Sequence, residues 1–423
     1  MTGSLTASRP FSALDVSSRE FWRLDPVERE KTFGRLRAEE PVSWQRPLYS
    51  PLMDGDDGSP GYWAVVRAED IATVSRRAEI FSSSVGGVLA EDFPEEVLEM
   101  ASSILTMDDP RHRDVRKLVS SVFTPKRVML IEQQIARQAR EIVGAIRDRG
   151  EAEFVSSVSA RLPMWTISEM IGIPPDRREE VADAAESMVA WGDDGDGGDD
   201  AATKMLNGIV VLHGACQDVI DARREQPEND LISALAAAEV DGERLTDEEI
   251  RSFFVLLCVA GNDTTKQTTT HTLRALTDHP EQREWLFADY EARIGTAVDE
   301  FVRWASPVMS FRRTALERFE LNGVVIEPGD KVTMFYSSGN RDESVLDRPE
   351  EFDLSRTPNP HVAFGGGGPH FCLGSHLAKM QLRWIFHELY TQLPDIRAVG
   401  EPERLVSTFI NGVRRQRCVF TPA

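Results

Sequence analysis

The segment LTDEEIRSFFVLLCVAGNDTTKQTTTHTLRALTDHP, which begins at Leu245, limits the possible folds more than any other part of the chain. It opens with a capping box, in which Thr246 is the N-cap and Glu249 follows three residues later, and Pro280 closes it. About 30 helical residues span ~45–50 Å, enough to cross the whole molecule. Residues 253–260 are apolar on every side, so we expect a long central helix that is buried at its middle.

The rest of the chain shows the same helical tendency. Helical periodicity predicts further helices over residues 128–149, 162–171 and 205–224. Strand patterns are few: residues 41–44 and 62–67 could pair, and GVVIEPGDKVTMFY predicts two strands joined by a Pro-Gly turn. The predicted fold is mainly α with minor β sheets. Because no linker divides it, we expect residues 1–423 to form a single domain in which residues 1–18 are loosely packed or disordered.

Charge and cysteine content exclude several classes of protein. A formal net charge of −22 argues against a nucleic-acid partner. The four cysteines (Cys216, Cys258, Cys372 and Cys418) are widely spaced with no CxxC, so they indicate neither a disulfide framework nor a zinc site. We find no signal-peptide pattern and no apolar run of the ~18–20 residues that a membrane span requires. We therefore expect a cytoplasmic protein with no membrane span.

Residues 191–200, WGDDGDGGDD, combine five aspartates with four glycines. Such a segment cannot pack into a core, and we expect a solvated loop between two helices. Calcium binding is the alternative, because oxygen ligands are dense there. The spacing and the terminal Glu of an EF-hand are missing, however.

The long helix is interrupted by polar residues directly after its apolar centre, in the run Ala260-Gly261-Asn262-Asp263-Thr264. Glycine costs a helix up to ~1 kcal/mol relative to alanine, and a buried carboxylate needs partners. The Thr264 hydroxyl can bond the carbonyl of Ala260 and bend the helix, which would leave a gap for a ligand. A kink with satisfied polar groups and no ligand is the alternative.

Three further motifs follow along the chain. Glu300 and Arg303 share one helical face, a pair that would contribute ~0–1 kcal/mol if exposed. The irregular stretch NRDESVLDRPEEFDLSR ends at Arg356. Finally FGGGGPHFCLG, residues 364–374, places four consecutive glycines before Cys372.

Together these four motifs, in this order, resemble the cytochrome P450 family of haem-thiolate monooxygenases. The long helix carries AGNDTT, the ExxR pair is Glu300 and Arg303, and Arg356 completes the family's Glu-Arg-Arg structural cluster. The resemblance covers nearly the whole chain, and the motif sequences are similar to those of actinobacterial lipid- and sterol-oxidising members. It implies a triangular helical prism, with haem between the long central helix and the helix after the cysteine loop.

The resemblance implies haem b as cofactor and Cys372 as the thiolate ligand of its iron. Glycine backbones would lie flat against the ring, and Gly374 would permit the tight turn into a helix over residues 375–389. The helix N-terminus and the iron would lower the thiolate pKa, and the thiolate would favour O–O cleavage. The spacing from Phe364 to Cys372 is one residue longer than is usual in the family, so which side chain packs over the thiolate is open. A small buried hydrophobe is the alternative role for this cysteine.

The resemblance also assigns the groups around the haem. Its propionates would be bound by His112, Arg116, Arg313 and His370, through charge-assisted contacts. Simple surface charges or structural pairs are the alternative for each of these. Dioxygen would sit beside Ala260 and Gly261 on the distal side, where Asp263 and Thr264 would deliver two protons.

The substrate is expected to be hydrophobic: a steroid, a branched lipid or fatty acid, or a terpenoid. By family position its lining residues would be Val88, Leu89, Met188, Trp191, Leu256, Val259, Val308, Met309, Phe409 and Ile410, which are nearly all apolar. Tailoring of macrolides or other secondary metabolites stays open, because fold-level analogy does not decide the substrate. A peroxide-driven peroxygenase and a haem-based sensor are further alternatives, which the Asp263–Thr264 pair disfavours.

Electrons must come from a separate protein, because the chain has no GxGxxG in a strand–helix context. Basic residues lie on the segments that the family uses to receive electrons: Arg113, Lys117, Lys126, Arg127, Lys379 and Arg383. We expect an acidic ferredoxin to dock there, with a reductase that draws on NAD(P)H, and we expect the enzyme to be a monomer.

Overall fold

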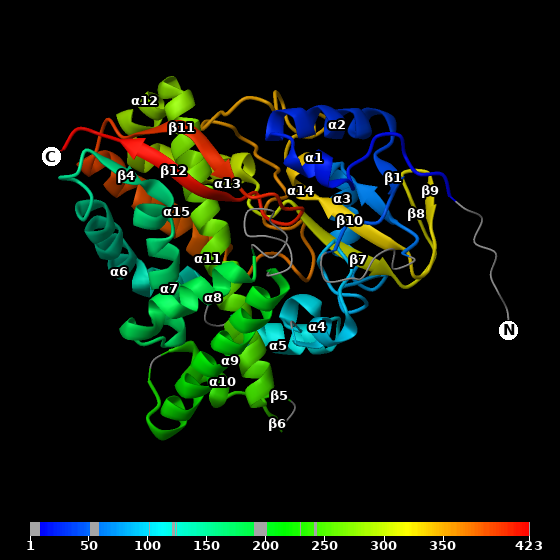
Figure 1. The fold of residues 1–423 in the computed structure, drawn as a ribbon, viewed down its shortest axis with the longest axis horizontal. Coiled ribbons are helices and arrows are strands. Elements are labelled where there is room, and N and C mark those ends of the chain that lie inside the picture. The colour runs from blue at the N-terminus through cyan, green and yellow to red at the C-terminus, as the bar shows by residue number, and fades with distance from the viewer. Residues whose placement is uncertain are drawn as a thin grey trace.

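The computed structural model describes residues 9–50, 59–100, 102–120, 123, 125–189, 201–228, 230–240 and 243–422. Within these ranges the chain is mainly helical and carries four small sheets, so the predicted fold class is confirmed (Figure 1). In that view most helices lie on the left and the largest sheet on the right. The Asp- and Gly-rich loop, including Trp191, lies outside the described residues.

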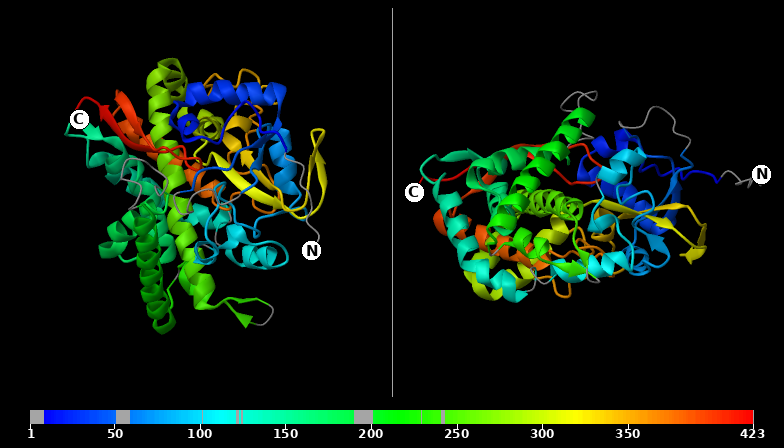
Figure 2. Two further views of the ribbon diagram at one scale, coloured as in Figure 1. Left: turned by 45° about the vertical axis from the view of Figure 1, so that its right-hand side comes forward. Right: turned by 90° about the horizontal axis from the view of Figure 1, so that it is seen from below.

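The predicted central helix is α11, Asp247–Asp278, with 32 residues. Thr246 and Glu249 form both halves of the capping box, since each side chain accepts from the other residue's backbone N–H. Figure 2 shows α11 running through the molecule from one side to the other. Its neighbours are α7, α8, α9, α13 and α15, so it is enclosed over most of its length.

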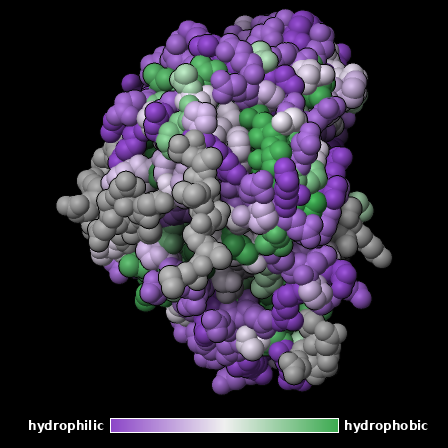
Figure 3. Space-filling view, turned by 90° about the vertical axis from the view of Figure 1, so that its right-hand side faces the viewer, coloured by the Kyte–Doolittle hydropathy of each residue, from purple (hydrophilic) through white to green (hydrophobic). Residues whose placement is uncertain are grey.

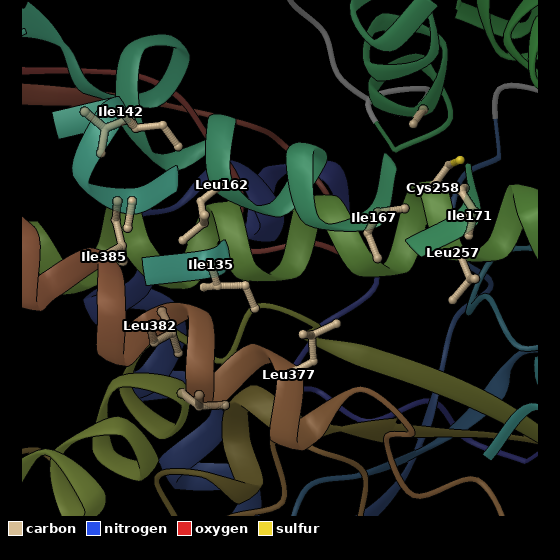
Figure 4. Close-up of a cluster of buried hydrophobic side chains, with 14 of the residues drawn as sticks. Ile135, Ile142, Leu162, Ile167, Ile171, Leu257, Cys258, Leu377, Leu382 and Ile385 are labelled. Atoms are coloured by element: carbon tan, nitrogen blue, oxygen red, sulfur yellow. The ribbon is translucent and has the colours of Figure 1, made fainter. Parts of the chain in front are cut away.

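Helices α6, α7 and α15 close the core on one side of α11. Their bounds are Pro125–Gly144, Arg161–Ile171 and Ser375–Gln392. Figure 4 shows side chains from these three helices and from α11 pointing toward one another. Ile135, Ile171, Leu382 and Leu389 are fully buried there. This packing of four amphipathic elements holds the floor of the site described below.

The largest sheet has the strand order β1-β2-β10-β7-β3. The predicted pairing of its first two strands is confirmed, because Val42 lies opposite Val65 in an antiparallel register. The predicted Pro-Gly turn joins two strands that belong to different sheets: β9 pairs with β8, whereas β10 pairs with β2 and β7. The strands of this sheet are β1 Val42–Gln45, β2 Tyr62–Val65, β3 Phe81–Ser82, β7 Ser310–Ala315 and β10 Lys331–Phe335.

The remaining elements surround this framework. The other strands are β4 Glu151–Glu153, β5 Glu239–Val240, β6 Glu243–Arg244, β8 Phe319–Leu321, β9 Val324–Ile326, β11 Arg397–Arg404 and β12 Val413–Val419. The other helices are α1 Arg19–Arg23, α2 Pro26–Glu39, α3 Ala68–Arg76, α4 Glu95–Met100, α5 Arg111–Ser120, α8 Arg178–Ser187, α9 Ala201–Glu225, α10 Leu231–Ala236, α12 Pro280–Ala288, α13 Tyr290–Ala305 and α14 Tyr336–Gly339. Short 3-10 and π turns occupy Ile104–Thr106, Pro175–Arg177 and Val155–Ser159.

Two expectations differ from the structure. The helix predicted over residues 128–149 ends at Gly144, because the chain then tightens into turns that lead to Gly150 at φ +76°. Residues 9–18 are not loose: Val16 is fully buried, and its carbonyl accepts from the indole N–H of Trp22 at 3.1 Å. Apolar burial of Val16 therefore ties this part of the N-terminus to the sheet side of the core.

The face shown in Figure 3 is mainly hydrophilic, and hydrophobic residues form separate patches on it. Over the described part of the chain, no helix combines the length and the apolar character that crossing a membrane requires.

Candidate active site

A cavity lies between α11 and the cysteine loop, residues 364–374. Ala260, Gly261 and Thr264 line it on the α11 side, and Cys372 lines it on the opposite side. The two motifs that were expected to enclose a haem therefore line one common space. Apolar side chains line the remainder toward α7 and β7: Val88, Ile104, Leu105, Phe123, Ile167, Phe253, Leu256, Leu257, Pro307, Val308 and Phe311.

Cys372 is held at the end of the loop by a hydrogen bond from its backbone N–H to the carbonyl of Phe364, at 2.9 Å. Burial raises the pKa of the Cys372 thiol, while the N–H of Gly374 and the nearby Arg116 act in the opposite direction. The helix terminus was expected to lower the pKa of this thiol. In the protein alone the effect of burial is larger, because a buried thiolate loses hydration. Binding to a metal would deprotonate this thiol outright.

Gly365 and Gly367 line the cavity, whereas Gly366 and Gly368 have a different structural reason. A Cβ on Gly366 would lie 2.7 Å from Cα of Ala72, and a Cβ on Gly368 would lie 2.3 Å from the carbonyl oxygen of Ser75. Ala72 and Ser75 belong to α3, so the glycines allow the loop to pack directly on that helix. Gly368 also has φ +79°, which favours glycine.

Gly374 was expected to permit a tight turn into the following helix. It is the N-cap of α15 with φ −86°, a conformation that is open to every residue. The turn itself therefore does not require glycine, and Gly374 instead lines the cavity.

The four predicted propionate-binding residues meet at one edge of the cavity. The rings of His112 and His370 lie 4.1 Å apart, and Arg116, Arg313 and His370 line the space. Arg313 is 4% exposed, and its Nη1 donates to the carbonyl of Arg312 at 2.7 Å. His112 is 2% exposed, and its Nε2 has no partner within the described ranges.

Two acids partly balance this basic set. Oδ1 of Asp109 lies 3.6 Å from Nδ1 of His112, and the charge of Asp108 acts to raise the pKa of His112, Arg313 and His370. Burial lowers the pKa of Arg313. Burial, together with the charges of Arg313, His112 and Arg116, lowers the pKa of His370 to about 3. Buried cations and an orphaned imidazole nitrogen are costly unless an anion joins them. A flat cofactor with two carboxylates at one edge fits this arrangement.

On α11 the predicted hydrogen bond is present: the Thr264 hydroxyl donates to the carbonyl of Ala260 at 2.9 Å. The helix is nevertheless continuous from Asp247 to Asp278. At Gly261 a Cβ would lie 2.4 Å from Cδ1 of Ile167 on α7, so a larger residue there would force the Ile167 side chain to shift. Close approach of α7 therefore explains the glycine, while Thr264 and Ala260 face the cavity.

Asp263 is buried and is not among the residues that line the cavity. Its Oδ1 lies 2.5 Å from Nζ of Lys266, and Oε1 of Glu186 on α8 lies 3.5 Å from the same nitrogen. Burial opposes the charge of Lys266, but the two carboxylates raise its pKa above the ordinary value. Sequence reasoning missed Lys266, although its position three residues after Asp263 on a helix was a usable signal.

The structure brings Glu300, Arg303 and Arg356 together in the core. Arg303 is fully buried, and its Nε and Nη2 donate to Glu300 at 2.7 and 2.6 Å. Its Nη1 also donates to the carbonyls of Asn340 and Pro349. Arg356 approaches the same carboxylate at 3.3 Å. This network fixes the segment that leads into the cysteine loop.

The predicted substrate-lining residues are distributed unequally. Val88, Leu256 and Val308 line the cavity. Met188 and Val259 pack against the main core, and Leu89 is half-buried.

The other predicted residues lie behind the wall of the cavity. Met309 is buried, and its sulfur accepts from Arg29 at 3.5 Å. The ring of Phe409 packs behind that of Phe311 at 5.6 Å, and Ile410 bridges to Val308. Three aromatic lining residues were not expected from the sequence: Phe123 between α5 and α6, Phe253 on α11 and Phe311 on β7.

Three features of this site are those of a haem-thiolate oxygenase. They are a cysteine in the wall of the cavity, the neighbouring Asp263 and Thr264 on α11, and an edge of the cavity where basic residues outnumber acidic ones. Comparisons with known proteins agree. A profile of the family described as Cytochrome P450 matches residues 204–391. The methyl-branched lipid omega-hydroxylase of Mycobacterium tuberculosis (strain CDC 1551 / Oshkosh) is 40% identical over 96% of this chain and 94% of its own.

Two further relatives support the same assignment. The steroid C26-monooxygenase of Rhodococcus jostii (strain RHA1) is 39% identical over 90% of this chain and 80% of its own. The structure of Mycobacterium marinum cytochrome P450 CYP268A2 in complex with pseudoionone has a TM-score of 0.94 at 50% identity, covering 98% of this chain and all of that one. The chain belongs to the cytochrome P450 family and is a monooxygenase of the haem-thiolate type.

Proposed function

We propose that this enzyme hydroxylates the terminal carbon of a methyl-branched aliphatic chain, such as a branched lipid or a steroid side chain. The observation that carries the proposal is the agreement between the relatives' names. An omega-hydroxylase and a C26-monooxygenase both place oxygen at a chain end. The pseudoionone bound by the structural neighbour is likewise a methyl-branched chain.

The cavity suits such a substrate. On the side of α7 and the N-terminal half of α11, the lining residues Ile167, Phe253, Leu256 and Leu257 carry no polar side-chain group. Burial of an aliphatic chain there is favourable by about 0.8 kcal/mol for each methylene group. These residues would bind and orient the chain and exclude water from its end.

The fit of the basic edge supports haem b as the cofactor. Cys372 would be the ligand of the iron, and His112, Arg116, Arg313 and His370 would hold the two propionates. When bound, haem would supply the iron at which dioxygen is activated.

Proton supply would rest on Asp263 and Thr264. Oδ1 of Asp263 is bound to Lys266, while Oδ2 is buried without a partner within the described ranges. Oδ2 is therefore the atom that can take a proton and pass it toward the Thr264 hydroxyl, which faces the cavity. Glu186 is exposed and adjoins Lys266, so it would connect this pair to solvent.

A ferredoxin, reduced through its reductase by NAD(P)H, would supply two electrons at the face formed by α5 and α15. Arg113 and Lys117 are exposed on α5. Lys379 pairs with Asp299 at 2.5 Å, and Arg383 pairs with Glu291, so these two contribute less net charge than expected. Side chains of Lys126 and Arg127 lie outside the described residues.

Substrate titration of the purified holoenzyme tests this function. The panel contains a methyl-branched fatty acid, its straight-chain isomer, a steroid with a full side chain, the same steroid without it, and a macrolide. Binding is followed by the haem spin-state shift, and products are located by mass spectrometry. We expect the two branched chains to bind tightest and to gain oxygen at the terminal carbon.

Oxidation of the macrolide or of the steroid ring in preference to a chain end would refute the proposal. Cys372→Ser provides the matching control for thiolate ligation. This variant should lose the absorption band that is typical of the carbon monoxide complex of a thiolate-ligated haem.

A further inference from the structure

The segment between β11 and β12, residues 405–412, returns to the side of the cavity, and we call it the return loop. The carbonyl of Phe409 accepts from the N–H of Met309 at 2.7 Å. Asn411 donates its backbone N–H to Pro307 at 3.0 Å and its side-chain amide to the carbonyl of Ala305 at 2.7 Å. The loop is thus bonded along the strand-like segment that follows α13.

Through this contact the return loop supports the wall of the cavity. The Phe409 ring lies 5.6 Å from the ring of Phe311, tilted by 40°, and Phe311 lines the cavity. Ile410 forms a β-bridge with Val308, which is also a lining residue. Displacement of the loop would move both side chains that back the wall, because close-packed rings transmit small shifts.

Helix α11 holds the return loop from the other side. Nε2 of His271 lies 2.8 Å from the carbonyl oxygen of Asn411. One turn earlier, Oε1 of Gln267 accepts from the N–H of Val413 at 2.8 Å. His271 lies two turns after Thr264, so one face of α11 carries both the catalytic hydroxyl and the support of the loop.

The chemistry of His271 suits a fixed donor. A carbonyl oxygen can only accept, so Nε2 carries the hydrogen. Burial, together with the charges of Arg404 and Arg29, lowers the pKa of His271 to about 4. The ring is therefore neutral at pH 7, and Nε2–H is its single N–H donor.

We propose that His271 is a positioning residue for the site of oxidation. Its Nε2–H fixes the carbonyl of Asn411, and this bond sets the position of Phe409 and hence of Phe311 against the bound chain. The inference rests on the proposed chain-end hydroxylation, because it assigns His271 to the selectivity of that reaction.

Three variants of the holoenzyme separate this role from general stability. His271→Leu removes the donor, whereas His271→Gln keeps an N–H near the position of Nε2. Thr272→Val is the matched control, because Thr272 is 1% exposed on the same helix and its hydroxyl has no partner in the described part of the chain. All three should retain the carbon monoxide band of a thiolate-ligated haem.

Backbone hydrogen exchange of residues 405–413 gives the first readout, and it needs no substrate. We expect exchange to accelerate about fivefold in His271→Leu, the factor that one neutral hydrogen bond represents. In His271→Gln and Thr272→Val it should change less than about twofold. The second readout is the ratio of terminal to internal hydroxylation on the best substrate of the panel, which should fall about fivefold in His271→Leu alone.

If the exchange rate of residues 405–413 is unchanged in His271→Leu, His271 does not hold the return loop. If the ratio of terminal to internal hydroxylation is unchanged, His271 has no role in selectivity. Equal effects in His271→Gln and His271→Leu would also overturn the proposal, because the donor would not matter. If no chain end is oxidised by the unmodified enzyme, the proposed function fails, while the exchange measurement still decides whether His271 holds the loop.

Discussion

Nζ of Lys266 lies 2.5 Å from Oδ1 of Asp263, and the two side chains are 3% and 5% exposed. The acid of the proposed proton-delivery pair is therefore held by a cation of its own helix. Glu186, on α8, approaches the same nitrogen from the surface at 3.5 Å. This geometry links the interior carboxylate to solvent through one buried lysine, and it makes the stability of α11 depend on the pair.

Removal of Lys266 should destabilise the enzyme strongly. Lys266→Met leaves the carboxylate of Asp263 buried and unpaired, which costs about 3–5 kcal/mol of unfolding free energy. Lys266→Met combined with Asp263→Asn should recover most of this loss, since no buried charge is left. Because the pKa of Lys266 is raised, the pair's contribution is present at pH 7 and is lost only as pH rises past lysine's ordinary value of about 10.4.

Urea unfolding at pH 7 measures the stability of the two variants and of the unmodified enzyme. Glu186→Gln is the control, and it should cost less than about 1 kcal/mol because its carboxylate is exposed. Equal stability of Lys266→Met and the unmodified enzyme would show that the pair carries no such energy.

Thr264→Ala should uncouple the reaction. If the Thr264 hydroxyl delivers protons as proposed, its loss would misdirect them, and product formed per dioxygen consumed should fall by about tenfold. Hydrogen peroxide should rise to match. Thr269→Val is the control, because Thr269 makes the same bond to the carbonyl four residues back at 2.9 Å but is buried away from the cavity. Tight coupling in Thr264→Ala would contradict the assigned role.

Arg303→Lys should fail to replace arginine in the core. Arg303 donates to Glu300 with two nitrogens and to the carbonyls of Asn340 and Pro349 with a third. A lysine has one nitrogen and cannot reach all three partners. We expect a loss of about 3–5 kcal/mol and poor haem retention, measured by urea unfolding and by the haem-to-protein absorbance ratio. Arg274→Lys, at a partly exposed ion pair, should cost less than about 1 kcal/mol.

Charge reversal on α5 should slow electron transfer from a ferredoxin. Arg113→Glu and Lys117→Glu place negative charge on an exposed part of the proposed docking face. The rate of reduction should fall about tenfold at low salt, and its dependence on ionic strength should weaken. Stopped-flow reduction with the purified ferredoxin tests this. Arg415→Glu on β12 is the control, and an equal effect there would refute this docking site.

Stability should decrease as pH falls from about 6.5 to 4, partly because of His271. Its pKa is lowered in the folded state, so the unfolded chain binds more protons in this window and acid favours unfolding. His271→Gln removes this titration, and its stability should depend less on pH between 6.5 and 4. Thermal unfolding at pH 7, 6 and 5 measures the difference. Thr272→Val should retain the full pH dependence of the unmodified enzyme.

Interactions between residues close together in the chain are predictable from the sequence alone. The capping box of Thr246 and Glu249 defined the start of α11 correctly, because both partners lie within one turn. The bond from Thr264 to Ala260 was predictable for the same reason. Cys372 stood out because four glycines precede it, a pattern that only a special backbone requires.

Contacts between distant segments were not predictable in this way. The glycine run indicated close approach, but α3 rather than the cofactor explains Gly366 and Gly368. Likewise the close neighbour of Gly261 is Ile167, which lies far earlier in the chain. No periodicity in the sequence places the carbonyl of Asn411 beside His271.

The amino-acid sequence by itself determined the buried central helix, the order of the four motifs and the choice of Cys372 as the proposed sulfur ligand. The helix follows from periodicity, which acts over a few residues. The role of Cys372 follows from the resemblance of the four motifs to those of the cytochrome P450 family. Tertiary structure alone decided which charges are paired, which aromatic rings line the cavity and which loop supports them. Such contacts depend on how the helices and sheets pack, and packing is fixed only when the whole core closes.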